Sequence, residues 1–268
     1  MHLSKNEQIL YDHFEDMYNG AYNRGTPIYS DFAGLNSIEL VYMLLDNKRI
    51  PKNLYDSRIR IYGGYDGAIY QMICFLPDND YIEVKKEDFP ISCVKISPVN
   101  NKFCDKLTHR DFLGAVMNLG IKRDQVGDIV VSEIDSYSKA YAAYIFCKSN
   151  KEKLISSITQ IKHTTVKTEI VSANDIAIEQ KFKDIPGSVA SLRLDCIISV
   201  ACKSSRSQCL TYIRSGNVYI NGRCCTEIAK EIKDGDIITI RGFGKYLIKT
   251  SEVTTKKGRF HITAKQYV

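Results

Sequence analysis

The stretch RLDCIISVACKSSRSQCLTYIRSGNVYINGRCCTEIAKEIKDGDIITIRG, residues 193–242, decides the fold of the last third of the chain. Within it, Ser205 is followed three residues later by Gln208, a spacing that predicts a capping box at the start of a helix. Arg206 then lies in the exposed first turn of this helix, where free backbone N–H groups and the helix dipole favour a phosphate. Another short helix is predicted just before it, over residues 192–201.

The helix that begins at Arg206 has an exposed face and a buried face. A helix turns by about 100° per residue, so its side chains separate into two groups. The exposed group is Ser207, Thr211 and Arg214, and the core-facing group is Cys209, Leu210 and Ile213. We expect Gly216 to end the helix in the left-handed conformation.

Short strands follow this helix and are separated by turn signals. Residues 218–220 and the turn Asn221-Gly222 predict a hairpin that brings Arg223 back toward the helices. Further turns are predicted at 234–236, 242–244 and 257–258. This arrangement would place four cations on one surface: Lys203, Arg206, Arg214 and Arg223. Ahead of the two helices, residues 172–188 are interpreted as a domain boundary, with Pro186-Gly187-Ser188 as a break in the chain.

The charge of this part favours an anionic partner. Residues 182–268 contain 15 Lys and Arg against 7 Asp and Glu, whereas the remaining 181 residues contain 22 against 24. A basic segment attached to a near-neutral body is typical of a localised contact with nucleic acid. Chance clustering on a solvated face is the alternative, and charge alone does not exclude it.

Residues 188–248 resemble the RNA-binding domain of small-subunit ribosomal protein S4. The pattern of that domain is present in order and spacing, with Ile220 in place of the usual Val: Arg193-Leu194-Asp195, Ser205-Arg206-Ser207, residues 213–222 and Gly235-Asp236. The resemblance implies a small α/β domain over residues 182–268 that binds RNA. The residues expected to contact RNA are Arg193, Lys203, Ser204, Ser205, Arg206, Ser207, Gln208, Thr211, Arg214, Asn221, Gly222, Arg223 and Lys245.

Residues 1–76 predict two helices followed by a β-hairpin. Ser4 and Glu7 form a capping box for the first helix, and Asn36 or Ser37 caps a second helix that stops before Pro51. Residues 58–77 predict two apolar strands joined through Gly63, Gly64 and Gly67.

Residues 77–174 alternate between strands and helices. Strands are predicted at 91–97, 128–134, 141–147 and 162–171, with a helix capped by Thr108 and Asp111 and a second helix over 151–159. The order strand–helix–strand–strand–helix–strand is that of a split βαβ sandwich, the topology of the RNA-recognition motif. Because this topology hosts many functions, it predicts only a fold.

Two further segments, GGYDGA at residues 63–68 and LTHRDFLGAVMNLGIKRDQVGDIVV at residues 107–131, resemble the bacterial YlmH family. This resemblance implies an α+β chain with an RNA-recognition-motif-like middle domain and a C-terminal S4-type domain. It also implies RNA binding, to ribosomal or transfer RNA, and in some members a link to stalled large ribosomal subunits that carry peptidyl-tRNA.

Composition excludes several other classes of protein. With 268 residues, 44% hydrophobic and 25% charged, the chain can bury a globular core. No stretch approaches the roughly 18 apolar residues of a membrane span, and MHLSKNEQILYDHF at the N-terminus lacks an apolar signal region. Nine cysteines fit a reducing compartment. We therefore expect a cytoplasmic protein with no membrane or small-molecule partner.

The sequence shows no clear metal or cofactor site. Zinc ligands usually occur as pairs spaced by two to four residues, and the cysteines of the last domain lack that spacing. We expect these residues to be small buried hydrophobes: Cys196, Cys202, Cys209, Cys224 and Cys225. Five tyrosines on predicted strands could stack on bases, but packing in the core or in a hairpin is favoured for Tyr62, Tyr65, Tyr70, Tyr141 and Tyr144.

Motifs that suggest catalysis are incomplete. Arg193-Leu194-Asp195 resembles the catalytic segment of pseudouridine synthases, but Leu192 replaces its glycine, so we expect Asp195 to cap the helix or pair with an arginine. His109-Arg110-Asp111 lacks the other kinase motifs, and residues 242–245 form no P-loop but a turn with an exposed Lys245. The leading hypothesis is a non-enzymatic RNA-binding protein. The alternatives are an RNA-modifying enzyme that recruits substrate through this domain, and a protein–protein adaptor.

Overall fold

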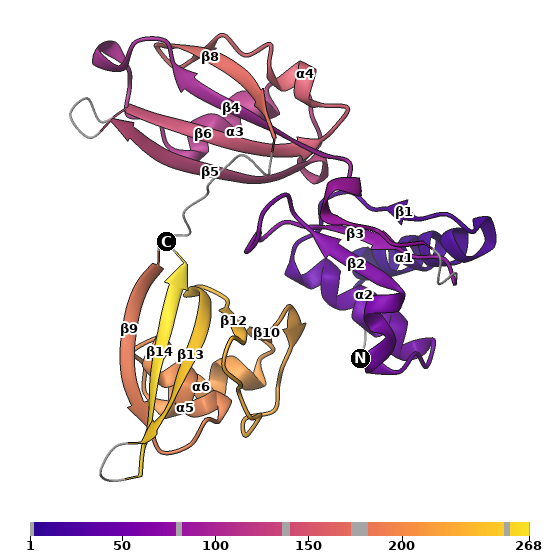
Figure 1. Cartoon of the computed structure of the whole chain (residues 1–268), viewed down its shortest axis with the longest axis vertical. Helices are drawn as coiled ribbons and strands as arrows, with labels where there is room; N and C mark the ends of the chain where they lie inside the picture. The colour runs from indigo at the N-terminus through magenta and orange to yellow at the C-terminus, as the bar shows by residue number, and fades with distance from the viewer. Residues whose placement is uncertain (1–2, 79–81, 136–139, 173–181, 255–257, 268) are drawn as a thin grey trace. The chain divides into compact units, whose positions relative to one another are not determined.

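The computed structural model describes residues 3–78, 82–135, 140–172, 182–254 and 258–267. The chain forms two compact units, residues 1–178 and 179–268 (Figure 1). Both units combine helices with antiparallel sheet, which confirms the expected α+β class. None of the helices in these ranges is long and apolar enough to cross a membrane.

Two helices and a three-stranded sheet form the N-terminal segment, residues 3–76. The predicted capping box of Ser4 and the predicted hairpin are both confirmed. The second helix begins earlier than predicted, because the backbone is already extended at Gly34, which is the N-cap in place of Asn36 or Ser37. The elements are α1 (Lys5–Arg24), β1 (Ile28–Tyr29), α2 (Leu35–Asn47), η1 (Lys52–Ser57), β2 (Ile59–Tyr62) and β3 (Met72–Phe75), with sheet order β1-β3-β2.

The middle segment, residues 82–172, follows the predicted order of strands and helices. Thr108 and Asp111 form the predicted capping box. The second predicted helix is shorter than 151–159, because the chain leaves it at Ser156-Ser157 through i→i+3 turns. The elements are η2 (Lys86–Asp88), β4 (Ile91–Pro98), η3 (Asn101–Phe103), α3 (His109–Met117), η4 (Arg123–Gln125), β5 (Val126–Asp135), β6 (Ala140–Lys148), α4 (Glu152–Ile155), β7 (Gln160–Ile161) and β8 (Thr164–Val171).

The order of the middle sheet, β5-β6-β4-β8-β7, places the first and third long strands side by side at its centre. All of its pairs are antiparallel, so the segment has the connectivity of a split βαβ sandwich. One face of this sheet packs on Phe112 and Val116 of α3. The likeness to RNA-recognition motifs in particular stays a prediction.

The N-terminal segment packs on the other face of the middle sheet. Phe32 and Phe89 join Cys93 and Phe146 in one buried cluster. The half of the interface near β5 is polar: the buried carboxylate of Asp128 accepts hydrogen bonds from Tyr65 Oη at 2.7 Å, from the backbone N of residue 69 at 2.7 Å and from that of residue 70 at 3.0 Å. Residues 1–178 are therefore one compact unit.

The C-terminal unit is a six-stranded sheet with two helices on one face. Buried residues of α5 and α6 form one core with Ile240, Tyr246, Ile248 and Ile262 of the sheet. The elements are β9 (Phe182–Val189), α5 (Leu194–Ala201), α6 (Arg206–Arg214), β10 (Val218–Ile220), β11 (Arg223–Cys224), β12 (Ile237–Ile240), β13 (Gly244–Thr254) and β14 (Phe260–Tyr267), with sheet order β11-β10-β12-β13-β14-β9.

The sequence Pro186-Gly187-Ser188, expected to be a break in the chain, instead lies inside β9. This interpretation was wrong because β9 is an edge strand, where a proline is tolerated; Pro186 is exposed and lies opposite Thr263. A Cβ at Gly187 would lie 2.5 Å from Val200 Cγ1, so glycine is needed for α5 to approach the strand. The glycine therefore reflects packing and not a linker.

Candidate nucleic-acid interface

A buried carboxylate joins the two helices of the C-terminal unit. Asp195, in the first turn of α5, is 4% exposed. Its Oδ1 accepts a hydrogen bond from Arg193 Nε at 3.2 Å, and its Oδ2 accepts one from Arg206 at 2.9 Å. The same guanidinium nitrogen of Arg206 lies 2.8 Å from Cys196 Sγ. The expectation that Asp195 pairs with an arginine is confirmed.

Arg206 combines this anchor with an exposed position. Its side chain is 63% exposed, although one nitrogen is held by Asp195. Cys196 and then the Asp195 carboxylate raise the pKa of Arg206, so the guanidinium is charged at neutral pH. The side chain is thus fixed in direction while most of it still faces solvent.

The start of α6 has the predicted capping box. Gln208 N donates to Ser205 Oγ at 3.4 Å, and Ser205 N donates to Gln208 Oε1 at 3.2 Å. Ser205 and Gln208 therefore hold the helix end in place, which is a structural role beside any contact with RNA. The predicted exposed face is confirmed, since Ser207, Thr211 and Arg214 are exposed. Of the predicted core-facing residues, Cys209 and Ile213 are buried, whereas Leu210 is only half-buried.

The hairpin that carries Arg223 is fastened to the turn before β12. Asn221 adopts a positive φ of 50° and Gly222 one of 82°, as an Asn-Gly turn requires. The Asn221 side chain donates to Asp236 Oδ1 at 2.9 Å and accepts from Ile237 N at 2.9 Å. The Asn-Gly and Gly-Asp parts of the sequence pattern therefore form one hydrogen-bonded contact between two turns.

The predicted RNA-contacting residues differ in how they are exposed. Most lie on or beside α5, α6 and the hairpin. Arg193, Lys203, Ser205, Arg206, Ser207, Gln208, Thr211, Arg214 and Asn221 are exposed, whereas Ser204, Gly222 and Arg223 are half-buried. Lys203 has a left-handed backbone, with a φ of 50°, in the turn between the helices.

Lys245 does not belong to this group. It lies in β13 opposite Thr239 of β12, and both alternate with core residues such as Tyr246 and Ile240. Because successive side chains of a strand point to opposite faces, Lys245 faces away from α5 and α6. It is also half-buried, so the expectation of an exposed lysine in a turn was wrong.

The cysteines of this unit behave largely as expected. Cys196 and Cys209 are buried, and burial raises the pKa of the half-buried Cys202 thiol to about 12. Burial also raises the pKa of the Cys209 thiol. Cys196, Cys202 and Cys209 all pack within or against the core of this unit, as small hydrophobic groups do. Cys224 and Cys225 are half-buried in and beside the short strand β11.

The five tyrosines singled out from the sequence, all in the first unit, each make contacts within the protein. Tyr65 stacks on Phe146 with ring centroids 5.0 Å apart, and Arg123 lies 4.2 Å from the ring of Tyr70; both tyrosines lie in the loop between β2 and β3 and not on strands as predicted. Tyr62 packs edge-on against Phe89. Lys95 lies over the Tyr144 ring and Lys106 over the Tyr141 ring. Packing, the favoured interpretation, is confirmed for Tyr62 and Tyr65.

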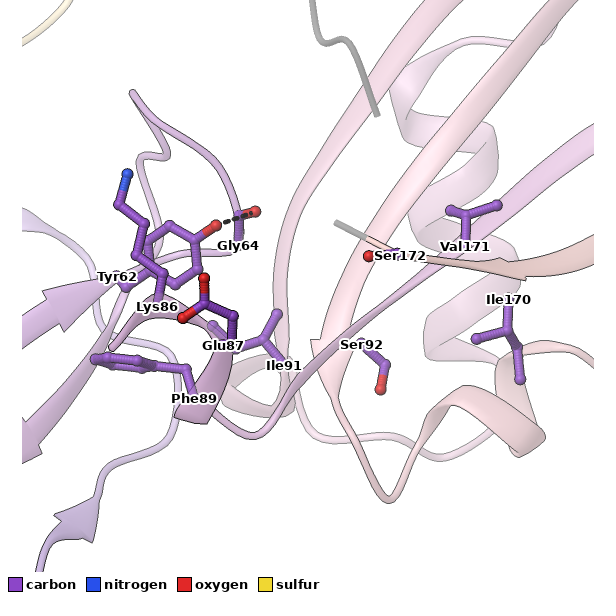
Figure 2. A pocket seen from close by; sticks show the side chains of 10 residues that line it. All are labelled: Tyr62, Gly64, Lys86, Glu87, Phe89, Ile91, Ser92, Ile170, Val171 and Ser172. Atoms are coloured by element: carbon purple, nitrogen blue, oxygen red, sulfur yellow. Dashed lines mark hydrogen bonds between the residues drawn. The ribbon is translucent and has the colours of Figure 1, made fainter. Parts of the chain in front are cut away.

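A cavity of about 330 Å³ lies where the N-terminal segment meets the middle sheet. Figure 2 shows Tyr62 and Phe89 on one side, Ile170 and Val171 on the other, and Ile91 between them. The Tyr62 hydroxyl donates to the Gly64 carbonyl at 2.6 Å, and burial raises the pKa of Tyr62. The lysine at its edge, Lys86, pairs with Asp66 outside the lining. This lining mixes apolar side chains with Lys86, Glu87 and two serines, and it holds no paired carboxylates or histidine.

Several residues with the chemistry of RNA contact were not singled out from the sequence. They lie on the face of the C-terminal sheet that bears Lys245: Phe182, Arg241, Lys249, Lys265 and Tyr267. The signal was available as alternation of polar and apolar residues in GKYLIKT and FHITAKQY. It could not be used without knowing that β9, β13 and β14 are neighbours.

Comparison with known proteins agrees with this arrangement. The model of the YlmH RNA-binding domain matches residues 84–175 and that of the S4 domain residues 192–238. The curated ribosome-associated protein quality control protein P2 of Bacillus subtilis (strain 168) is 29% identical over 207 residues, 75% of each chain. The solved structure of the cell division protein ylmH from Streptococcus pneumoniae is 24% identical, with a TM-score of 0.48, over 64% of this chain and 94% of that chain. The chain therefore contains a YlmH-type RNA-binding domain followed by an S4 domain.

Proposed function

We propose that this chain is a non-enzymatic, cytoplasmic RNA-binding protein that docks structured ribosomal or transfer RNA through α5, α6 and the β10–β11 hairpin. The observation that carries the proposal is the fixed, exposed Arg206 at the start of α6, held by the buried Asp195. A guanidinium of set direction beside free helix N–H groups suits a phosphate oxygen.

Neighbouring cations extend this site. Lys203 is exposed in the turn before α6 and Arg214 in its last turn, while Arg223 lies on the hairpin. Positive side chains spread over a helix and a hairpin can contact several phosphates of a folded RNA at once. The name of the Bacillus subtilis relative places that protein in ribosome-associated quality control. We therefore extend the proposal to binding on large ribosomal subunits, including stalled ones.

The environment of Asp195 argues against the alternative of a pseudouridine-synthase-like enzyme. Both of its carboxylate oxygens are bonded to arginines. The cavities of about 330 and 470 Å³ found among the described residues are lined by the first unit and do not include it. Incubating the protein with bulk RNA and analysing the nucleosides tests this point: formation of pseudouridine would support the enzyme.

Sedimentation with purified large ribosomal subunits through a sucrose cushion tests the main proposal. The wild-type chain should pellet with the subunits in low salt, and Arg214→Glu should lower the bound fraction at least tenfold because it reverses an exposed charge. Lys153→Glu, an exposed charge reversal on α4, is the matched control and should bind like wild type. Equal loss in the two variants, or no pelleting of the wild type, would contradict the proposed site.

A further inference from the structure

The face of the C-terminal sheet opposite α5 and α6, here called the outer face, carries interleaved aromatic and basic side chains. Partners in antiparallel register point to the same face. Tyr267 of β14 lies opposite Phe182 of β9, and Lys265 lies opposite Leu247 of β13. Among the described residues of this unit, the only two helices pack on the other face. The outer face is therefore a second surface, distinct from the candidate interface.

The two outer rings are held against each other and flanked by cations. The centroids of Phe182 and Tyr267 are 4.9 Å apart in an edge-to-face arrangement. Lys245 Nζ lies 5.1 Å from the centroid of Tyr267, and Lys265 Nζ lies 5.5 Å from that of Phe182. Both rings are only half-buried, so part of each remains in contact with solvent.

A third cation–aromatic pair lies farther along the sheet. Arg241 follows β12 and donates to the Tyr219 hydroxyl at 2.9 Å, with its guanidinium carbon 5.6 Å from the ring. Tyr219 is 4% exposed, so it orients Arg241 and does not itself offer a stacking surface. Tyr219 lies opposite Thr239, which lies opposite Lys245. The pair therefore lies in the same cross-strand row as Lys245 and the two rings.

The charge of the outer face is positive. Its cations are Arg241, Lys245, Lys249 and Lys265. The anions beside them are Asp184, which is 3.8 Å from Lys265, and Asp234, which is 3.3 Å from Lys249. Among the described residues, the four cations of this face outnumber its two carboxylates, so the face has a net positive charge.

The geometry points to a second RNA-binding surface on this face, one that takes an unpaired segment of RNA by stacking its bases on Tyr267 and Phe182 and holding its phosphates with Arg241, Lys245 and Lys265. Each nucleotide has a base, which can stack on an aromatic ring, and a phosphate, which can bind a neighbouring cation. Bases can reach such rings only where they are unpaired. An acidic peptide would match the charges but leave the rings unused.

This second surface extends the proposed function. It rests on that function only because both proposals require the protein to bind RNA. Its stacking residues lie outside residues 192–238, the part that matches the S4 domain model, because Phe182 precedes that range and Tyr267 follows it. A single unit would then hold a folded RNA with its helices and an unpaired strand with the opposite side of its sheet.

Fluorescence anisotropy of the full chain with a labelled 12-nucleotide oligouridylate tests the inference. Tyr267→Leu should raise the Kd at least about fivefold, because stacking on one ring is lost, whereas Tyr267→Phe should bind like wild type because it keeps the ring. Lys245→Gln should flatten the dependence of log Kd on log salt by about 0.7, one phosphate contact to a single strand. Tyr22→Leu, which removes a tyrosine that is 58% exposed on α1, is the matched control and should have no effect.

Crosslinking gives a readout that does not depend on the variants being folded. A 4-thiouridine-substituted oligouridylate should crosslink wild-type protein within residues 182–189 or 260–267. The inference would be overturned if the crosslinks were confined to residues 193–223. It would also be overturned if Tyr267→Leu kept the wild-type affinity for oligouridylate, or if Tyr22→Leu lost as much affinity as Tyr267→Leu. A Tyr267→Leu variant that binds oligouridylate normally but loses affinity for an oligoglutamate peptide would likewise overturn it, since the face would then bind protein. Arg214→Glu separates the two proposals, because it should weaken binding to large subunits without removing the oligouridylate crosslinks at 182–189 or 260–267.

Discussion

Arg206 in the first turn of α6 donates a 2.9 Å hydrogen bond to the carboxylate of Asp195 in the first turn of α5. The carboxylate is buried while the guanidinium is mostly exposed. One contact therefore does two things: it holds the starts of the two helices together, and it fixes the direction of a cation at the surface. Changing either residue should affect both stability and RNA binding, but not in the same proportion.

Asp195→Asn should destabilise the C-terminal unit. The amide oxygen can still accept from one arginine, but the amide NH2 replaces the other oxygen and places a donor against the second arginine. We expect the transition of this unit in calorimetry to fall by about 4–8 °C, the shift that 1 kcal/mol produces in a domain of this size. A melting temperature unchanged from wild type would show that the pair does not hold the helices together.

Arg206 and Arg214 should respond differently to removal of their charge. Arg214→Ala should flatten the slope of log Kd against log salt by about one unit without changing the melting temperature, as expected of an exposed phosphate contact. Arg206→Ala should flatten the slope and also lower the melting temperature, because Asp195 loses a partner. If Arg206→Ala lowers only the melting temperature and keeps the wild-type salt slope, Arg206 is structural and Lys203, Arg214 and Arg223 remain as the phosphate contacts.

Protonation of Asp111 at low pH should lower the free energy of unfolding of the first unit. A hydrogen bond from Lys162, at 2.8 Å, and then bonds within the Thr108 capping box lower the pKa of Asp111 to about 2. Because the folded pKa lies below the unfolded value of about 3.9, the stabilisation is complete above about pH 5 and is lost as pH falls through 4 toward 2. Asp111→Asn should therefore melt below wild type at pH 6, and the difference should shrink at pH 2.5. A difference that is the same at both pH values would contradict this assignment.

Gly187→Ala should destabilise the C-terminal unit although alanine suits a strand better than glycine does. The new Cβ would meet Val200 Cγ1 at 2.5 Å, so α5 must move away from β9. We expect a lower melting temperature, partly restored by the second change Val200→Ala, which removes the contact. A Gly187→Ala variant as stable as wild type would show that α5 adjusts freely.

A fragment of residues 182–268 should fold alone and keep most of the affinity for structured RNA. It contains the complete core around Leu194, Ile213, Ile240 and Tyr246, and all six strands of its sheet. Circular dichroism and a cooperative thermal transition check folding, and anisotropy with ribosomal RNA checks binding. A fragment that binds at least ten times more weakly than the full chain would place essential contacts in the first unit.

Local signals in the sequence were enough to predict most helices and the turns between short strands. The capping boxes at Ser4, Thr108 and Ser205 depend on residues three apart, and the Asn221-Gly222 turn depends on two adjacent residues. All the residues that determine these features are therefore neighbours in the sequence. The start of α2 could not be predicted in the same way, because Gly34 caps it with its backbone alone.

Features that depend on distant partners could not be predicted. Pro186 was interpreted as a break because nothing nearby shows that its strand lies at a sheet edge beside β14. Lys245 was assigned to the wrong surface because its face is set by pairing with β12. The pairing of Asp195 with an arginine was predicted, but the choice of Arg206 as well as Arg193 depends on how α5 packs against α6.

The pairing of β9 with β14 has a consequence for how this unit can be combined with other proteins. Phe182, near the start of the unit, lies directly opposite Tyr267, near its end, so the two ends emerge side by side. A domain whose ends are adjacent can be spliced into a surface loop of another protein without stretching either one. The C-terminal unit is thus suited to insertion into other proteins. A chimera with residues 182–267 inserted in a surface loop of an unrelated protein should bind RNA as the unit itself does.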